Sequence, residues 1–367
     1  MASLIEVSVN VPGAAYVVTL GEGALDRIGE LVAPPATGQR AAVVADGTTA
    51  ALFGARVTAS LAGAGWQPHL VTVPPGEASK TLRSAERLYE ECAAAGLDRG
   101  STVFALGGGV VGDLAGFVAA TYLRGIALVQ VPTTLLAQVD SSVGGKVGVD
   151  LPRAKNLVGA FHQPVAVIAD PATLCSLPPR ELAAGLAEVV KHAAIADAEL
   201  FRQIETQAPA LLALDLGVLT EIVACNCRIK ASVVALDPLE RSGLRAVLNY
   251  GHTIGHAIER AAASWGVLHG EAVAVGMVAE AKMAAELGLS GSAVADRLGA
   301  LLSTLGLPIA APRERIEVER AESALRSDKK IVGGRLALPV VSEIGRAELI
   351  RDVPVEALLR GLHGALR

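Results

Sequence analysis

The chain is poor in aromatic residues and has little excess charge of either sign. Aromatic side chains make up 3% of its 367 residues, and the formal net charge at pH 7 is -5. Proteins that bind nucleic acid usually combine a basic surface with aromatic side chains on which bases stack. The composition therefore excludes a nucleic-acid partner and favours small-molecule chemistry.

Cysteine is also scarce, and its spacing is not that of a metal or disulfide motif. The four cysteines are Cys92, Cys175, Cys225 and Cys227. They form no C-x-x-C pair, and Cys225 with Cys227 alone is a poor zinc or disulfide signature. This pattern indicates reduced thiols, as in cytoplasmic proteins.

One apolar stretch, residues 102–123, is long enough to span a membrane. Asp113 lies at its centre, where a charge costs about 2.5 to 3.5 kcal/mol on insertion, and its several glycines weaken a helix. We interpret the stretch as a strand, a turn and a buried helix. The N-terminus, residues 1–7, has no basic region followed by an apolar block, so it carries no secretory signal. We expect a cytoplasmic protein with no membrane partner.

The first half of the chain alternates short apolar runs with helical patterns. The runs that we predict to be strands are residues 41–45, 69–73, 102–106, 127–131 and 165–169. This alternation is typical of a parallel sheet with helices on its faces. Beyond about residue 177 the apolar spacing becomes helical, and residues 336–341 are the one late strand candidate. We expect an α/β N-terminal domain with a Rossmann-like parallel sheet in residues 1–172 and a mostly α-helical C-terminal domain in residues 173–367.

A glycine turn follows the predicted strand at residues 102–106. Residues 107–113 read Gly-Gly-Gly-Val-Val-Gly-Asp and open a predicted helix, whose first N–H groups can bind phosphate. The spacing departs from the G-x-G-x-x-G fingerprint, and tight packing of a helix on a sheet is the alternative explanation for these glycines. Support for a nucleotide site comes from residues 74–80 and 132–134, which also follow predicted strands, where ligands of parallel sheets bind. Asp46 follows another strand and could accept ribose hydroxyls, or it is simply a polar residue at a strand end.

Two histidines four residues apart indicate a metal site. His252 and His256 lie on one face if residues 253–263 are helical. A zinc protease would need a glutamate directly after the first histidine, where Thr253 stands. The metalloprotease hypothesis therefore lacks its general base.

Other side chains could complete such a site. Glu188, His252 and His269 offer one carboxylate and two imidazoles, the set of catalytic zinc sites that keep one coordination position open. His269 precedes a helical pattern that begins at Glu271, where the helix dipole disfavours imidazolium, so we expect a neutral ring. Spacing alone leaves open which three groups converge.

Cationic residues gather in two glycine-rich segments, residues 140–146 and 155–163. Lys146 and Lys155 in these segments, with Asn156, are suited to bind anions. Lys191 lies one helical turn after Glu188, a spacing that on its own predicts only an ordinary salt bridge.

Six motifs occur in a fixed order along the chain. They are G-G-G-V-V-G-D at residues 107–113, V-D-S-S-V-G-G-K at 139–146, K-N-L-V-G at 155–159, L-A-E-V-V-K-H at 186–192, L-N-Y-G-H-T-I-G-H at 248–256 and D-K-K at 328–330. In this order they resemble the 3-dehydroquinate synthases of the sugar-phosphate cyclase superfamily. The resemblance implies conversion of 3-deoxy-D-arabino-heptulosonate 7-phosphate to 3-dehydroquinate and phosphate, a lyase reaction of the shikimate pathway to chorismate and the aromatic amino acids. It also implies transient oxidation by NAD+, which is not consumed, and a Zn2+ or Co2+ ion.

The resemblance further implies roles for individual residues. It makes Glu188, His252 and His269 the metal ligands and gives His256 a part in proton transfer beside the metal. The implied NAD+ contacts lie mainly at strand ends and glycine turns: Asp46, Gly76, Glu77, Lys80, Gly109, Val110, Val111, Gly112, Asp113, Thr133, Thr134, Asp140, Lys146, Lys155, Thr173, Leu174, Cys175 and Ser176.

Substrate contacts are implied for a second set of polar residues: Asp140, Lys146, Asn156, Lys191, Asn249 and Lys330 or its neighbour Lys329. Arg124 is expected to reach the phosphate of a neighbouring subunit, which implies a homodimer. Lys230 and Arg245 match the pair that holds the substrate carboxylate, so we favour this substrate over heptulose phosphates that lack one. Glu240 stands one residue farther from Arg245 than is usual, and it is an active-site carboxylate only if the loop bulges between them.

Three other functions remain in view. A metal-dependent polyol dehydrogenase shares the fold and the histidine-rich site but would release NADH, and it has no need of so many anion-binding residues. Another sugar-phosphate cyclase would act on a different sugar phosphate. A catalytically silent paralogue is disfavoured because no predicted ligand is missing.

Overall fold

The computed structural model describes residues 4–34, 38–152, 154–262, 265–326, 331–332 and 335–367. The chain divides into two compact units, Met1–Leu177 with Leu219–Ala235 and Pro178–Val218 with Leu236–Arg367. Residues 173–177 and 219–235 thus group with the first unit, whereas the division drawn from the sequence places them in the second domain.

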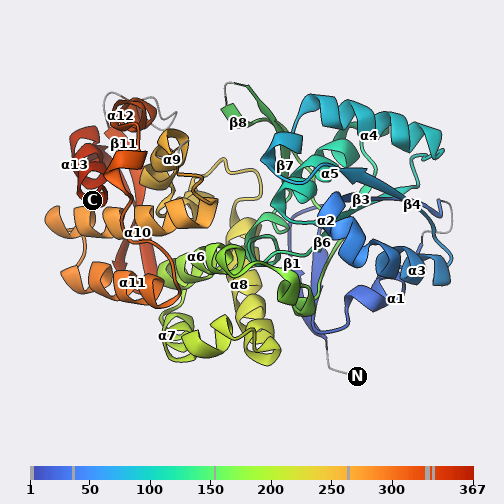
Figure 1. The fold of residues 1–367 in the computed structure, drawn as a ribbon, viewed down its shortest axis with the longest axis horizontal. Coiled ribbons are helices and arrows are strands. Elements are labelled where there is room, and N and C mark those ends of the chain that lie inside the picture. The colour runs from blue at the N-terminus through green and yellow to red at the C-terminus, as the bar shows by residue number, and fades with distance from the viewer. Residues whose placement is uncertain (1–3, 35–37, 153, 263–264, 327–330, 333–334) are drawn as a thin grey trace. The chain divides into compact units, whose positions relative to one another are not determined.

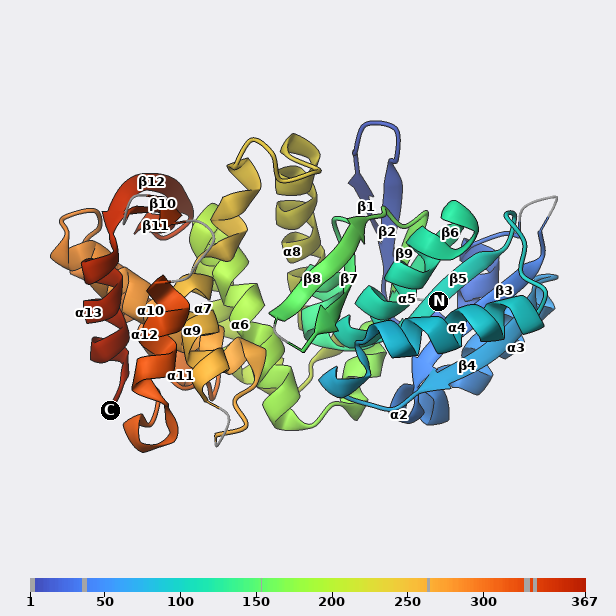
Figure 2. The same ribbon diagram turned by 90° about the horizontal axis from the view of Figure 1, so that it is seen from above.

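The first unit is built on a seven-stranded sheet in the order β1-β2-β9-β6-β5-β3-β4. Its strands are β1 (Ile5–Val9), β2 (Tyr16–Leu20), β3 (Arg40–Asp46), β4 (Gln67–Val73), β5 (Thr102–Gly107), β6 (Ala127–Pro132) and β9 (Ala166–Ala169). Neighbouring strands pair in parallel, except that β1 and β2 form an antiparallel hairpin. Figure 2 shows this hairpin projecting beyond the parallel strands. The five strands predicted from apolar runs are confirmed, but β1 and β2 were not predicted.

The first unit also contains several helices. They are α1 (Ile28–Leu31), α2 (Gly47–Thr49), α3 (Ala55–Gly63), α4 (Leu82–Ala94), α5 (Gly109–Thr121) and most of α8 (Leu216–Leu236), with shorter turns η1 (Leu25–Arg27), η2 (Ala50–Gly54), η3 (Glu77–Ser79), η4 (Tyr122–Arg124), η5 (Ala137–Ser141) and η6 (Pro171–Ser176).

The central strands are apolar throughout because helices cover both faces of the sheet. Along β5, Val103 and Ala105 belong to the apolar core shared with α4 and α5. Phe104 and Leu106 face the opposite core, shared with α1 and α3. Figure 1 shows α4 and α5 on one side of these strands and α1 and α3 on the other. Residues 102–123 are therefore a buried strand followed by a buried helix, as predicted.

A second hairpin in this unit carries residues of the two glycine-rich segments, for which no strand was predicted. Strand β7 (Lys146–Leu151) pairs antiparallel with β8 (Ala154–Phe161), and Gly148 lies directly opposite Gly159. A Cβ on Gly159 would lie 2.3 Å from the carbonyl oxygen of Val147. These glycines therefore permit close pairing of two strands, and this is why the segment does not resemble strands in the sequence.

The second unit is mostly helical. Its elements are α6 (Pro179–Ala196), α7 (Ala198–Leu212), η7 (Leu244–Asn249), α9 (His252–Ala261), α10 (His269–Glu286), α11 (Ser292–Thr304), η8 (Arg313–Arg315), α12 (Val318–Arg326), α13 (Val355–Ala365) and the antiparallel sheet of β10 (Ile331–Val332), β11 (Arg335–Glu343) and β12 (Arg346–Pro354). The predicted late strand lies within β11. Its neighbour β12 was not predicted, because it is largely exposed and polar.

Helix α10 lies at the centre of the second unit, packed against α6, α9, α11 and α13 (Figure 1). Small residues let its backbone approach its neighbours closely. A Cβ on Gly270 would lie 1.9 Å from the carbonyl oxygen of Ala184 on α6, and a Cβ on Gly276 would lie 1.9 Å from that of Gly251, just before α9. This close approach lets side chains of α6, α9 and α10 meet.

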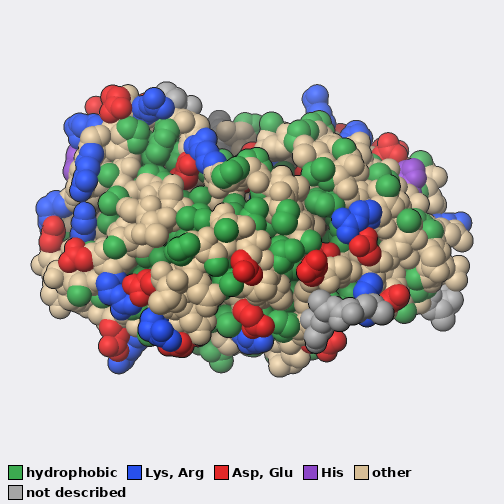
Figure 3. Space-filling model, turned by 60° about the horizontal axis from the view of Figure 1, so that its bottom comes forward, with side chains coloured by type: hydrophobic (Ala, Val, Ile, Leu, Met, Phe, Trp, Pro, Cys, Tyr) green, Lys and Arg blue, Asp and Glu red, His purple; other side chains and the backbone are tan. Residues whose placement is uncertain are grey.

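The surface has no strong segregation of charge on the face seen in Figure 3. Among the described side chains there, acidic and basic groups are interspersed with apolar ones. In the described part of the chain, no helix is both long enough and apolar enough to cross a membrane.

Candidate metal and active site

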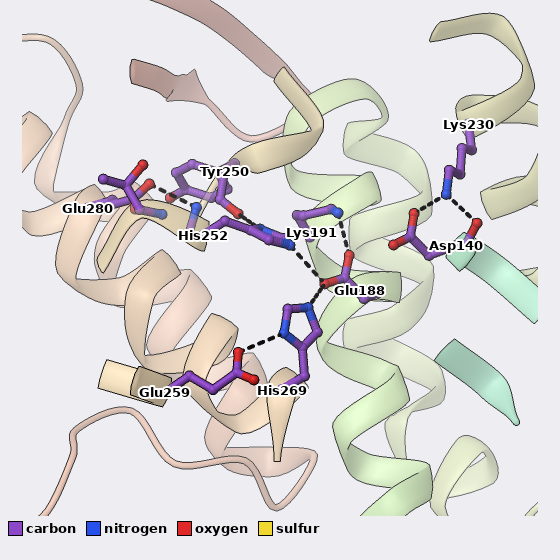
Figure 4. Close-up of polar contacts among 11 residues, drawn as sticks. Asp140, Glu188, Lys191, Lys230, Tyr250, His252, Glu259, His269 and Glu280 are labelled. Carbon is purple, nitrogen blue, oxygen red and sulfur yellow. Dashed lines mark hydrogen bonds and ion pairs between the residues drawn. The ribbon is translucent and has the colours of Figure 1, made fainter. Parts of the chain in front are cut away.

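Three polar side chains from three helices meet inside the second unit (Figure 4). Glu188 of α6 is fully buried, and its Oε1 lies 3.6 Å from Nε2 of His252 at the start of α9. The same oxygen lies 3.7 Å from Nε2 of His269 at the start of α10. Donor atoms around a tetrahedral zinc ion, each about 2.0 to 2.2 Å from it, lie about 3.4 Å apart. The three donors are therefore spaced to share one cation.

The surroundings of Glu188 also fit a bound cation. Among the described residues, neither carboxylate oxygen of Glu188 receives a hydrogen bond. Lys191, one turn farther along α6 and equally buried, forms an ion pair with Oε2. The other oxygen, Oε1, is buried and accepts no hydrogen bond from the described part of the chain, which is costly, and a second cation at Oε1 would offset that cost. The residues present fit a divalent metal ion.

Both histidines are held through the ring nitrogen that faces away from Glu188. Nδ1 of His252 lies 3.0 Å from the carbonyl oxygen of Tyr250, and Nδ1 of His269 lies 3.2 Å from a carboxylate oxygen of Glu259. Because both partners are acceptors, Nδ1 carries the proton of the neutral ring and Nε2 keeps its lone pair. The lone pairs of both rings thus point toward the shared centre.

The pKa values of the two rings are shifted in opposite directions. Burial, the nearby charge of Lys191 and the two neighbouring histidines hold the pKa of His252 well below its ordinary value. Burial also opposes the charged form of His269, but the hydrogen bond to Glu259 and the charge of Glu188 outweigh it and raise the pKa of His269. Two carboxylates flank the ring of His269, and their effect on its pKa opposes the one expected from the helix dipole.

His256 stands beside this set on the exposed side of α9. Its ring centroid lies 5.2 Å from that of His252 and 5.7 Å from that of His269. One nitrogen of each of these three rings falls within 4.8 Å of the others, so three histidines are an alternative ligand set. The 3.6 and 3.7 Å distances from Oε1 of Glu188, an oxygen that accepts no hydrogen bond from any described residue, favour the set of one carboxylate and two imidazoles. His256 then remains accessible next to this set.

Sequence reasoning missed the residue that anchors the start of α9. The buried carboxylate of Glu280, in the middle of α10, accepts hydrogen bonds from the backbone N–H groups of Gly251, Thr253 and Ile254 at 2.8, 3.1 and 3.1 Å. The first N–H groups of a helix have no partner within it. Glu280 supplies that partner and thereby fixes the helix that carries two of the histidines. A lone acidic residue inside an otherwise apolar helix was the signal that could have revealed it.

In the first unit, the predicted nucleotide-binding clusters lie along one edge of the sheet. They follow the carboxyl ends of the parallel strands: Asp46 after β3, Glu77 and Lys80 after β4, Gly109 after β5, Thr133 and Thr134 after β6, and residues 173–176 after β9. Gly108 precedes the first turn of α5 and has no side chain that could accept hydrogen bonds from the first N–H groups of this helix. This helix start fits a pyrophosphate group.

Some members of these clusters also have structural partners. Oδ1 of Asp46 accepts hydrogen bonds from the N–H groups of Thr48 and Thr49. A Cβ on Gly112 would lie 2.8 Å from Oε1 of Gln130, the end of a side chain that would have to shift, so close packing of α5 on the sheet favours glycine here. Thr173 is buried and donates a hydrogen bond of 2.7 Å to the carbonyl oxygen of Asp170.

Lys80 is the centre of a polar network at the same edge. Its ammonium group contacts carboxylate oxygen Oδ2 of Asp113 and the side-chain oxygen of Asn156. Burial raises the pKa of Asp113, although Lys80 opposes that shift. Burial likewise raises the pKa of Glu77 against the attraction of Lys80 and Lys155. The network joins the ends of β4, α5 and the β7–β8 hairpin.

Comparison with known proteins agrees with this geometry. The family model for the N-terminal part of 3-dehydroquinate synthase matches residues 70–184, and the model for the C-terminal part matches residues 185–331. The chain belongs to the 3-dehydroquinate synthase family. A 3-dehydroquinate synthase from Symbiobacterium thermophilum is 53% identical over 355 residues, which cover 96% of this chain and 98% of that protein.

Two solved structures of other cyclases share the fold. One is 2-deoxy-scyllo-inosose synthase complexed with carbaglucose-6-phosphate, NAD+ and Co2+, with a TM-score of 0.87, 28% identity, and coverage of 99% of this chain and 100% of that one. The other is 2-epi-5-epi-valiolone synthase from Streptomyces hygroscopicus with NAD+ and Zn2+ bound, with a TM-score of 0.85, 28% identity, and coverage of 100% and 98%. The predicted fold class is confirmed.

The residues expected to contact substrate in a 3-dehydroquinate synthase occupy both units. In the first, Asp140 and Lys230 form an ion pair, while Lys146 and Asn156 are exposed on the β7–β8 hairpin and Arg124 is exposed after α5. In the second, Asn249 is half-buried at the end of η7 and Arg245 is buried. Lys329 and Lys330 lie outside the described residues.

The loop before Arg245 has an unusual backbone at Glu240. This residue has a φ of 54°, in the left-handed region. The same loop wraps around Asp237, whose carboxylate accepts hydrogen bonds from the N–H groups of Arg241 and Gly243 at 2.8 and 3.1 Å. A left-handed residue at this point locally redirects the chain between Asp237 and Arg245.

Proposed function

We propose that this chain converts 3-deoxy-D-arabino-heptulosonate 7-phosphate to 3-dehydroquinate and phosphate. The observation that carries the proposal is the 53% identity to a 3-dehydroquinate synthase over nearly the whole chain. The buried carboxylate and two imidazoles supply a metal-binding set of the kind this reaction needs. When bound, NAD+ takes up and returns a hydride, and Zn2+ or Co2+ polarises substrate oxygens.

In this proposal Glu188, His252 and His269 hold the metal ion. Lys191 lies beside Glu188 and offers hydrogen-bond donors to a substrate oxygen. His256 lies next to the set but on the exposed side of its helix, so it can exchange a proton with bound substrate and with solvent.

The first unit would bind NAD+ along its carboxyl edge. The start of α5 at Gly109 suits the pyrophosphate, and Asp46, Glu77 and Lys80 stand on the neighbouring strands. We propose residues 1–172 as the NAD-binding domain and residues 173–367 as the metal- and substrate-binding domain.

The remaining cations suit a substrate with two anionic groups. Lys146 and Asn156 would bind the phosphate, with Asn249 and a lysine at residues 329–330 as further contacts. Lys230 and Arg245 would hold the carboxylate. Both are buried, and a buried cation is costly unless an anion accompanies it. Asp140 already pairs with Lys230, and the substrate carboxylate would add a further anion beside these two cations, which a heptulose phosphate without a carboxylate could not do.

Arg124 is proposed to act across a homodimer. Leu123 and Arg124 both have positive φ values, 51° and 71°, and the arginine is exposed. Such backbone strain costs about 1 to 3 kcal/mol per residue and commonly marks a functional position. Mixing the inactive variants Arg124→Ala and His256→Ala should restore part of the activity if each site uses both subunits, and no recovery would contradict the shared site. We also propose a cytoplasmic location, since all four cysteines are free thiols.

One assay distinguishes this function from its alternatives. Purified protein with zinc and a trace of NAD+ should release phosphate from 3-deoxy-D-arabino-heptulosonate 7-phosphate far in excess of the NAD+ present, while NADH absorbance does not accumulate. Release only from heptulose phosphates without a carboxylate would indicate another cyclase. NADH that accumulates with polyols and without phosphate release would indicate a dehydrogenase.

A further inference from the structure

The two histidines of the candidate metal set are held by partners of different charge. His252 donates from Nδ1 to a backbone carbonyl oxygen, that of Tyr250. His269 contacts the carboxylate of Glu259 instead, at 3.2 Å. The exposures differ as well: the side chain of His252 is 10% exposed and that of His269 is 35% exposed. His269 is thus the less confined of the two rings.

We propose that Glu259 is the positioning residue of the metal site, a role that rests on the proposed function. Glu259 lies near the end of α9, and its carboxylate reaches across to His269 at the start of α10 (Figure 4). The contact fixes the proton on Nδ1 and directs Nε2 toward Oε1 of Glu188, 3.7 Å away. Glu259 therefore acts on the metal through His269 and does not coordinate it.

The charge of Glu259 adds to this geometric effect. A carboxylate hydrogen-bonded to the distal nitrogen of an imidazole makes the other nitrogen a stronger donor to a metal ion. Glu188 and Lys191, the other charged groups near the ring, are paired with each other. Glu259, whose side chain is 17% exposed, is the carboxylate in contact with the distal nitrogen of His269 and strengthens that ring as a ligand.

The test measures zinc affinity of the intact chain with a competing chelator. Glu259→Ala should weaken zinc binding about 10- to 100-fold, the usual effect of losing such a partner. Glu259→Gln keeps an oxygen that can accept from Nδ1 but loses the charge, so its affinity should fall between those of Glu259→Ala and the unaltered chain. Glu286→Gln is the matched control, because it removes the same charge from the exposed end of α10 and should bind zinc normally.

A second readout separates positioning from a general loss of stability. The visible absorption of bound Co2+ reports the ligand geometry, so it should change in Glu259→Ala and remain unchanged in Glu286→Gln. Normal zinc affinity with an unchanged cobalt spectrum in both Glu259 variants would overturn the positioning role alone. If the unaltered chain bound no zinc, the metal site of the proposed function would fail, and this role with it.

Discussion

The carboxylate of Glu280 accepts a hydrogen bond of 2.8 Å from the backbone N–H of Gly251. A helix usually has its first N–H groups capped by a side chain just before it. Gly251 cannot do this for α9, and a residue of α10 takes that part instead. The hydrogen bonds thus join the start of α9, which carries His252 and His256, to the middle of α10, which carries His269.

Replacing Glu280 by glutamine should destabilise the second unit. The amide has one acceptor oxygen in place of two, and its NH2 group would face N–H groups that need an acceptor. Each hydrogen bond to a charged group contributes about 1.5 to 3 kcal/mol to stability. We therefore expect the variant to lose about 2 kcal/mol or more in the free energy of unfolding. Urea unfolding of the metal-free chain measures it, with Glu286→Gln as the control of equal charge change. Equal stability of the two variants would contradict the capping role.

Gly276→Ala should force α9 and α10 apart. The added Cβ would lie 1.9 Å from the carbonyl oxygen of Gly251, which is backbone and cannot rotate away. We expect a loss of at least about 1 to 3 kcal/mol in stability, as for overpacked cores, together with weaker zinc binding. Gly299→Ala on α11 is the control, because nothing lies within 4 Å of its added Cβ. That change should leave stability equal or raise it by about 0.4 to 1 kcal/mol. If Gly276→Ala and Gly299→Ala had the same free energy of unfolding, the close approach of α9 and α10 would not be needed for the stability of the site.

Asp237 makes the stability of its loop depend on pH. Burial alone would raise its pKa, but hydrogen bonds from Ser242, Arg241 and Arg245 lower the pKa of Asp237 to about 2, from an ordinary value of 3.8. A depressed carboxyl pKa stabilises the fold fully above the ordinary value, and this stabilisation is lost as the pH falls toward about 2.

Comparison with Asp237→Asn checks this expectation. The unaltered chain should be more stable than the variant near neutral pH, and the gap should narrow as the pH falls from about 4 toward about 2. Urea midpoints of both proteins across that range provide the measurement. A gap that stays constant would mean that the charge of Asp237 does not stabilise the loop.

The sequence predicted the parts of the fold that depend on local pattern. Strands β3, β5, β6 and β9 were recognisable because helices cover both of their faces, which demands continuous apolar runs. Strand β4, at the edge of the sheet, was recognised although it is largely exposed. The β7–β8 hairpin was not, because the close pairing of Gly148 with Gly159 removes the side chains that normally mark a strand. Strand β12 was not predicted either, because it is largely exposed and therefore has no continuous apolar run.

The candidate site, like the fold, could be predicted where it depends on local sequence pattern and not where it depends on packing. The spacing of His252 and His256 in the sequence indicated a metal centre, and the structure brings His269 and Glu188 to it. Glu259 and Glu280 could not be assigned from spacing, because their contacts depend on how closely α9 packs on α10. The raised pKa of His269 was not foreseen for the same reason, since the carboxylate of Glu259 was not expected beside it.

The most direct test of the account is the anomalous diffraction of a crystal of this protein grown with zinc, recorded at the zinc absorption edge. The account predicts a peak at bonding distance, about 2.0 to 2.2 Å, from Oε1 of Glu188 and from Nε2 of both His252 and His269. A peak bound by His256 in place of Glu188, or no peak at these residues, would contradict it.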